Sequence, residues 1–81
     1  MKWLANFRLY CHEHDVNLLP DDMRYLESIL KKISPIDRRQ IAMNYYSTWI
    51  KGITDSPYPS IAQNNGRRRA NEYLGKVLRT K

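Results

Sequence analysis

Cysteine, glycine and proline are all scarce in this chain of 81 residues. The one cysteine, Cys11, cannot form a disulfide within the chain, and its isolation favours a reducing, cytoplasmic setting. The three glycines and four prolines are few and lie mostly near predicted element boundaries, so a long disordered segment is not expected. No apolar run approaches the ~18 residues of a membrane-spanning helix, so we expect no membrane partner.

What the sequence does contain is apolar residues at helical spacing. Hydrophobic residues make up 42% of the chain, enough for one small core and therefore for one domain, residues 1–81. The apolar residues recur every three or four positions rather than in alternation. The pattern predicts an all-α fold, a small bundle of about four helices.

The strongest helix signal covers residues 34–53, which we expect to form the central helix. Ser34 is a candidate N-cap, and Pro35 follows at the first helical position, where proline is tolerated. Two neighbouring rows of apolar residues are predicted to face the core. The first row is Ala42, Tyr46, Trp49 and Ile53, and the second is Ile36, Met43 and Ile50.

Three further helices are predicted around this one. The first covers about residues 3–14, and the second starts near Pro20, whose following acids Asp21 and Asp22 suit a helix N-terminus. The last helix has two alternatives. It begins at Asn64 or Asn65, or it runs from residue 60 to 79 with Gly66 inside it, at a cost of ~1 kcal/mol.

The net charge of +6 lies entirely in the second part of the chain. Residues 1–33 carry five basic and five acidic side chains, whereas residues 34–81 carry nine basic and three acidic ones. Such an asymmetry favours an anionic partner, either nucleic acid or an acidic protein surface.

The Asn-Asn-Gly-Arg-Arg-Arg segment is the sharpest candidate for an anion-binding site. If the last helix starts here, its free N–H groups, a glycine that permits close approach and adjacent arginines could bind phosphate or carboxylate. The arginines fan around a helix, which suits an extended nucleic-acid backbone better than one small anion. The predicted site consists of Asn65, Gly66, Arg67, Arg68, Arg69, Lys76, Arg38 and Arg39.

Arg38 and Arg39 also raise the alternative of a helix-turn-helix module. They lie in the first turns of the helix that follows a tight turn, where a recognition helix contacts base edges. The apolar character of the rest of that helix is unlike a helix that lies free in a groove.

Aromatic residues provide a second kind of candidate site. Tyr45, Tyr46 and Trp49 are too crowded on one helix to point into the same core, and we expect Tyr45 to emerge outside. Tyr58 lies between two prolines in a loop. Tyr45, Trp49 and Tyr58 are therefore candidate anchors for a protein partner or for a homodimer interface.

Catalytic and metal-binding signals are weak. The Cys-His-Glu-His-Asp run at residues 11–15 offers two ligands on one helix face and no second pair, so no metal site is predicted. Phosphate-binding loops and nucleophile motifs are absent from the sequence. We expect neither an enzyme nor a bound cofactor.

The segments SPIDRRQIAMNYYSTWIKGI and NNGRRRANEYL, within residues 34–75, resemble small uncharacterised basic helical proteins encoded by phages and prophages. This resemblance implies a protein that binds DNA or redirects a host enzyme, and it assigns no functional residue. The leading hypothesis is a non-enzymatic accessory protein that binds nucleic acid, DNA more readily than RNA. The alternative is an adaptor or inhibitor of a host replication or recombination enzyme.

Overall fold

The structure is a computed structural model that describes residues 1–80, and over that range it confirms the all-α prediction. Four α-helices and one 3₁₀ turn make up its regular structure, and residues 1–80 contain no strand. The elements are α1 (Trp3–Glu13), α2 (Pro20–Leu30), the 3₁₀ turn (Pro35–Asp37), α3 (Arg38–Thr54) and α4 (Pro59–Arg79).

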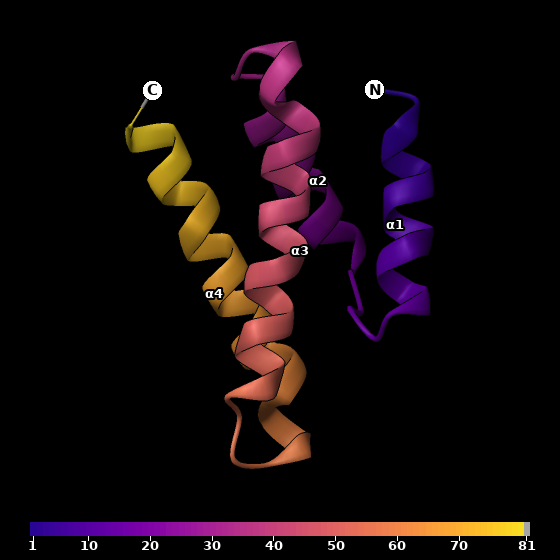
Figure 1. Ribbon diagram of the computed structural model, residues 1–81, viewed down its shortest axis with the longest axis vertical. Helices are drawn as coiled ribbons and strands as arrows, with labels where there is room; N and C mark the ends of the chain where they lie inside the picture. The colour runs from indigo at the N-terminus through magenta and orange to yellow at the C-terminus, as the bar shows by residue number, and fades with distance from the viewer. Residues whose placement is uncertain (81) are drawn as a thin grey trace.

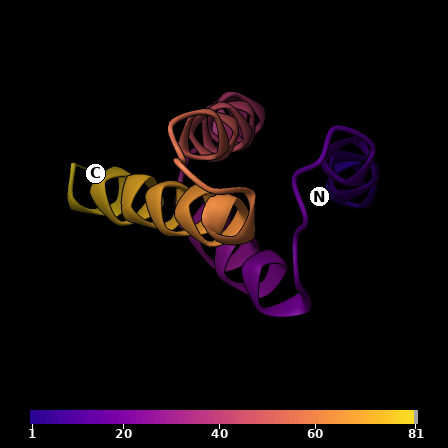
Figure 2. The same cartoon turned by 90° about the horizontal axis from the view of Figure 1, so that it is seen from below.

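Helix α3 lies at the centre of the bundle, as predicted (Figure 1). Helix α4 follows a short loop and returns along α3, while α2 lies behind them. Helix α1 runs in the same direction as α3 but stands at the edge of the bundle, as the view from below shows (Figure 2). Its apolar side chains bridge the distance to the other helices.

The start of α3 differs from the prediction. The Ser34 side chain makes no capping hydrogen bond, and its carbonyl oxygen instead accepts the Asp37 N–H at 2.9 Å. Residues Pro35–Asp37 therefore form a 3₁₀ turn, and the α-helix begins at Arg38. A 3₁₀ turn is a frequent lead-in to an α-helix because it satisfies carbonyls within three residues.

Helix α4 is continuous through Gly66, which confirms the second alternative and excludes a start at Asn64 or Asn65. The reason is a close crossing of α3 and α4. A Cβ placed on Gly52 would lie 2.7 Å from the Gly66 Cα, and one placed on Gly66 would lie 2.4 Å from the Trp49 Cδ1. Only glycine permits two helix backbones to approach this closely.

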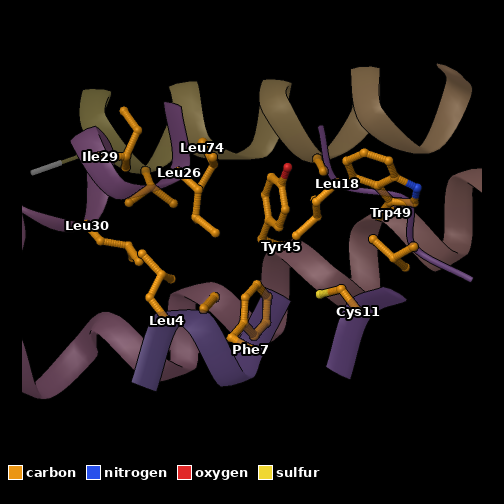
Figure 3. Close-up of a cluster of buried hydrophobic side chains, with 14 of the residues drawn as sticks. Leu4, Phe7, Cys11, Leu18, Leu26, Ile29, Leu30, Tyr45, Trp49 and Leu74 are labelled. Atoms are coloured by element: carbon orange, nitrogen blue, oxygen red, sulfur yellow. The ribbon is translucent and has the colours of Figure 1, made fainter. Parts of the chain in front are cut away.

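The core contains the predicted Ala42 and Trp49, but it differs from the prediction on one side of α3. Tyr45 is fully buried and points from α3 toward α4, whereas Tyr46 is half-buried (Figure 3). Ile36 and Met43 are exposed, although both were predicted to be buried. The buried stripe is centred on the α4 crossing, so it runs through Gly52, a residue that hydrophobic spacing does not mark.

The other helices bring their apolar faces to the same core. Buried side chains come from α1, α2, α4, the connector between α1 and α2, and the turn after α2 (Figure 3). The set comprises Leu4, Phe7, Cys11, Val16, Leu18, Leu26, Ile29, Leu30, Ile33, Ala70, Leu74 and Val77.

Burial of Cys11 predicts a thiol that reacts slowly in the native protein. Burial raises the pKa of Cys11 from 9.0 to about 12, because the thiolate would lose its hydration. Since the folded pKa is the higher one, the stabilisation that this group contributes is complete below pH 9 and is lost as the pH rises toward 12. We expect iodoacetamide at pH 9 to alkylate the native protein far more slowly than the urea-unfolded chain. Equal rates would contradict this assignment.

Candidate functional site

The three consecutive arginines of α4 do not act as one site, because each contacts a different part of the molecule. Arg67 turns inward and pairs with Asp22. Arg68 turns outward and lies 3.5 Å from Glu72, one helical turn further on. Arg69 reaches across to α3 and pairs with Asp55 at 2.7 Å.

Arg67 is the most constrained of the three. Its Nε donates to both carboxylate oxygens of Asp22, at 3.1 and 2.9 Å, and its other nitrogens donate to Asn64 Oδ1 and the Asn17 carbonyl. The guanidinium also lies 5.0 Å from the centre of the Trp49 ring. Asp22 is only 5% exposed and also accepts the Leu19 N–H. Arg67 therefore neutralises a buried carboxylate, and it could contact an external anion only by leaving that carboxylate uncompensated.

A second set of polar contacts ties the α1–α2 connector to α4. Gln63 Oε1 accepts hydrogen bonds from the Asn17 N–H at 3.1 Å and from the Trp49 indole N–H at 3.0 Å. Gln63 also donates to the Asp15 carbonyl. Asp15 has φ 64°, a left-handed conformation that turns the chain out of α1 toward these partners. These hydrogen bonds fix the α1–α2 connector against α4 and so help to hold α1 in place.

Asn65 and Gly66 lie inside α4 and offer no free helix N-terminus. Asn65 Nδ2 donates to Ser56 Oγ at 2.8 Å, and Gly66 is buried against Trp49. The phosphate-binding geometry predicted for these two residues is therefore not formed.

Several accessible cations lie on α4, and another lies on α3. Arg68, Lys76 and Arg79 are exposed on α4, Arg69 is half-buried beside them, and Lys51 is exposed on α3. Among the described residues, Lys51, Lys76 and Arg79 take part in no ion pair. We call these five residues the basic face: Lys51, Arg68, Arg69, Lys76 and Arg79.

A polar groove of about 280 Å³ lies between α3 and α4 beside Arg69 and Lys76. It is lined by Thr48, Arg69, Glu72, Tyr73 and Lys76. Asn44 donates to the Tyr73 hydroxyl at 3.0 Å and accepts from Gln40 at 2.9 Å, which continues the polar strip along α3. The groove thus combines two cations and two hydroxyl groups, which can contact phosphate and sugar, with the carboxylate of Glu72, whose charge is offset by its pairing with Arg68.

Arg38 and Arg39 lie away from the basic face. Arg38 Nε donates to the Leu30 carbonyl at 2.8 Å, which closes the end of α2. The Arg39 guanidinium lies 5.6 Å from the centre of the Trp3 ring, between α3 and α1. The structure therefore does not bring these two arginines together with Arg68, Arg69 and Lys76.

The predicted aromatic anchors are also separated. Tyr45 and Trp49 are completely buried, so neither side chain reaches a surface where a partner could bind, contrary to the prediction. Burial, followed by the nearby Asp22 carboxylate, raises the pKa of Tyr45. Tyr58 is 65% exposed and remains a candidate contact.

Sequence reasoning missed an aromatic groove between α1 and α3. A cavity of about 550 Å³ opens there to the surface, lined by Trp3, Asn6, Phe7, Tyr10, Arg39 and Met43. A signal was present in the sequence. Asn6 lies at helical spacing between Trp3 and Tyr10, and Arg39 lies at helical spacing between Ile36 and Met43, so each predicted apolar face contains a polar residue. We call this feature the α1–α3 groove.

Neither a metal cluster nor a membrane-spanning helix was found within residues 1–80. That part of the chain contains no group of three or more His, Cys, Asp or Glu residues placed to hold an ion. Both histidines of the Cys-His-Glu-His-Asp run contact backbone carbonyls, His12 that of Leu18 and His14 that of Tyr10. In the described residues no helix is both long and apolar enough to cross a bilayer.

Protein-family models, curated proteins and solved structures were compared with the chain. None of them matches it. The function must therefore be inferred from the chemistry of the two surfaces, the basic face with its polar groove and the α1–α3 groove.

Proposed function

We propose that this protein is a small, non-enzymatic, cytoplasmic accessory protein that binds nucleic acid along the basic face. The proposal agrees with the resemblance to phage and prophage proteins and with the positive charge of residues 34–81. Binding would be driven by phosphate contacts and would depend only weakly on base sequence.

The observation that carries the proposal is the row of exposed cations along α4, where Arg68, Lys76 and Arg79 share one helix face. Lys51, Lys76 and Arg79 are exposed and have no acidic partner within the described residues, and Lys76 and Arg79 lie one helical turn apart on α4. Arg68 and Arg69 do have partners, but their pairs are open to solvent, with side chains 61% and 38% exposed. Exposed ion pairs contribute only ~0–1 kcal/mol, so a phosphate can replace the carboxylate at little cost.

Arg67 has no part in this interface, which changes how the proposal must be tested. A variant that removes all three consecutive arginines would lose the buried partner of Asp22 and with it much of its stability. Loss of binding in such a variant would report unfolding as readily as a lost contact.

The test is a triple variant of surface cations, Lys51→Ala/Lys76→Ala/Arg79→Ala. Fluorescently labelled single- and double-stranded DNA and RNA would be titrated at about 50 and 200 mM salt. For the wild type we expect micromolar or tighter binding that weakens steeply with salt, and for the variant an affinity at least ~10-fold lower. The magnitude of the negative slope of log K against log salt should decrease by about 2–3, since each lost phosphate contact on duplex DNA reduces that magnitude by ~0.9.

A matched control is Lys2→Ala/Lys31→Ala/Lys32→Ala. It also removes three positive charges, but from the residue before α1 and the two residues after α2. We expect the affinity of this control to lie within about twofold of that of the wild type, because the control loses net charge but no contact of the basic face. Equal losses in both variants, or no binding by the wild type at low salt, would reject the basic face as a nucleic-acid interface.

A further inference from the structure

The α1–α3 groove has a regular construction that the nucleic-acid proposal does not use. The two helices run in parallel and meet through pairs of side chains at the same sequence interval. At one end the Arg39 guanidinium lies over the Trp3 ring, and at the other the Tyr10 and Tyr46 rings are 5.2 Å apart. Trp3 and Tyr10 are seven residues apart on α1, so the groove is about 10 Å long at 1.5 Å per residue. That length matches two turns of a docked helix.

The groove is apolar and only partly covered. Phe7 lies at its base in the core, while Met43 is 41% and Tyr10 is 39% exposed. Ile36, which precedes Met43 by seven residues, is 88% exposed. Apolar and aromatic side chains gathered on one exposed surface mark an interaction site more often than a chance arrangement. Aromatic residues and methionine are also the residues most enriched in the centre of protein interfaces.

Charge indicates what kind of partner fits. Arg39 is the only charged residue among those lining the groove. It lies over Trp3, where its guanidinium can keep the ring contact and still donate hydrogen bonds to a carboxylate. A second copy of this chain fits poorly, because two molecules of net charge +6 would repel each other and a two-fold axis at the groove would bring Arg39 toward its own copy.

We propose that the α1–α3 groove binds an amphipathic helix of an acidic partner protein. Apolar side chains at positions i, i+3 or i+4 and i+7 of that helix would enter between Trp3, Tyr10 and Met43, the usual spacing of helix-in-groove recognition. An Asp or Glu on the rim of the partner helix would pair with Arg39. The inference is independent of nucleic-acid binding. Arg39 and Met43 are turned toward α1, whereas most residues of the basic face belong to α4.

The test begins with a displayed library of peptides about 16 residues long, which is long enough to form a helix on binding. The apolar positions i, i+3, i+4 and i+7 are fixed and the polar positions are randomised. After selection against the full-length protein, an enriched peptide is labelled with fluorescein, and its binding is measured by anisotropy at about 150 mM salt. We expect enrichment of Asp and Glu and a micromolar affinity.

Two charge-reversal variants, each checked for folding by circular dichroism, locate the bound peptide. Arg39→Glu should weaken the acidic peptide at least ~10-fold, and it should favour a version of the peptide with Lys in place of Asp and Glu. Lys51→Glu makes the same charge change at an exposed position of α3 that does not line the groove, and it should leave the affinity within about twofold. Met43→Glu, which places a carboxylate in the groove, should abolish binding.

Several outcomes would overturn the proposal. They are enrichment without acidic residues, equal effects of Arg39→Glu and Lys51→Glu, and competition for the peptide by a single-stranded oligonucleotide. Sedimentation equilibrium provides the remaining test. A dimer that dissociates in Met43→Glu would show that a second copy occupies the groove.

Discussion

Arg67→Ala is expected to lower the free energy of unfolding by about 3–5 kcal/mol, the usual cost of removing one partner from a buried ion pair. Asp22 would remain buried with a single backbone donor, the Leu19 N–H. The variant would also lose the hydrogen bond to the Asn17 carbonyl and the contact with the Trp49 ring. For a domain of this size the loss is a large share of a total of about 5–15 kcal/mol. Urea denaturation followed by circular dichroism measures it.

Arg68→Ala is the matched control, since it is the same substitution at the next position of the same helix. Its partner Glu72 is exposed and lies 3.5 Å away, so we expect a change within about 0.5 kcal/mol. A double-mutant cycle of Arg67→Ala with Asp22→Ala should show strong coupling, because the second substitution removes the uncompensated carboxylate. Similar small losses for Arg67→Ala and Arg68→Ala would refute the assigned role of Arg67.

Gly66→Ala is expected to destabilise the protein by about 2–3 kcal/mol, even though alanine favours a helix. The added methyl would lie 2.4 Å from Trp49 Cδ1 and 2.7 Å from the Trp49 carbonyl oxygen. A backbone oxygen cannot turn aside as a side chain can, and the indole is held by its hydrogen bond to Gln63. The helices must therefore move apart, which should lower the melting temperature by on the order of 10 °C.

Gly75→Ala provides the opposite result in the same helix. A Cβ at this position meets only the Tyr25 hydroxyl, at an ordinary contact distance of 3.9 Å. The gain in helix propensity should then be observed without a clash, as a stabilisation of up to ~1 kcal/mol. Thermal unfolding of the two variants would show shifts of opposite sign. A stabilising Gly66→Ala would mean that α3 and α4 do not touch at this crossing.

Much of the fold could be predicted from the sequence because local signals determine it. Helix α1 covers nearly the predicted residues, and helix α2 begins at the predicted Pro20, because this proline and the acids after it are strong start signals. The order and number of helices followed from hydrophobic spacing. The buried side of α3 did not, because Tyr45 and Tyr46 are chemically identical and only the position of the α4 crossing decides which is enclosed.

The crossing itself could have been inferred from one overlooked pattern. Ala62, Gly66 and Ala70 recur every four residues and form a strip of small side chains along α4. Read by itself, the Asn-Asn-Gly segment is typical of a helix terminus. Read with Ala62 and Ala70, it is typical of a helix that packs closely against a neighbour.

The arginine run shows where sequence reasoning stops. Arg67, Arg68 and Arg69 are the same residue type, yet a helix directs successive side chains about 100° apart. Which of them turns inward depends on where Asp22 lies in space, and the acidic start of α2 already had a sufficient local explanation. Distant pairs of this kind carry no local signature. The basic face and the α1–α3 groove therefore became visible only when the helices were assembled.

The pairing of Asp22 with Arg67 also bears on how the chain matures on the ribosome. The two residues are 45 positions apart in the sequence, and Asn17, whose carbonyl accepts a hydrogen bond from the same arginine, is 50 positions from it. While the protein is being synthesised, Asp22 and the Asn17 carbonyl are translated long before Arg67, the residue that contacts both. Closing so long a loop carries an entropic cost that must be met before these contacts contribute. The contacts that join the α1–α2 connector and the start of α2 to Arg67 therefore form only after most of the chain has been translated.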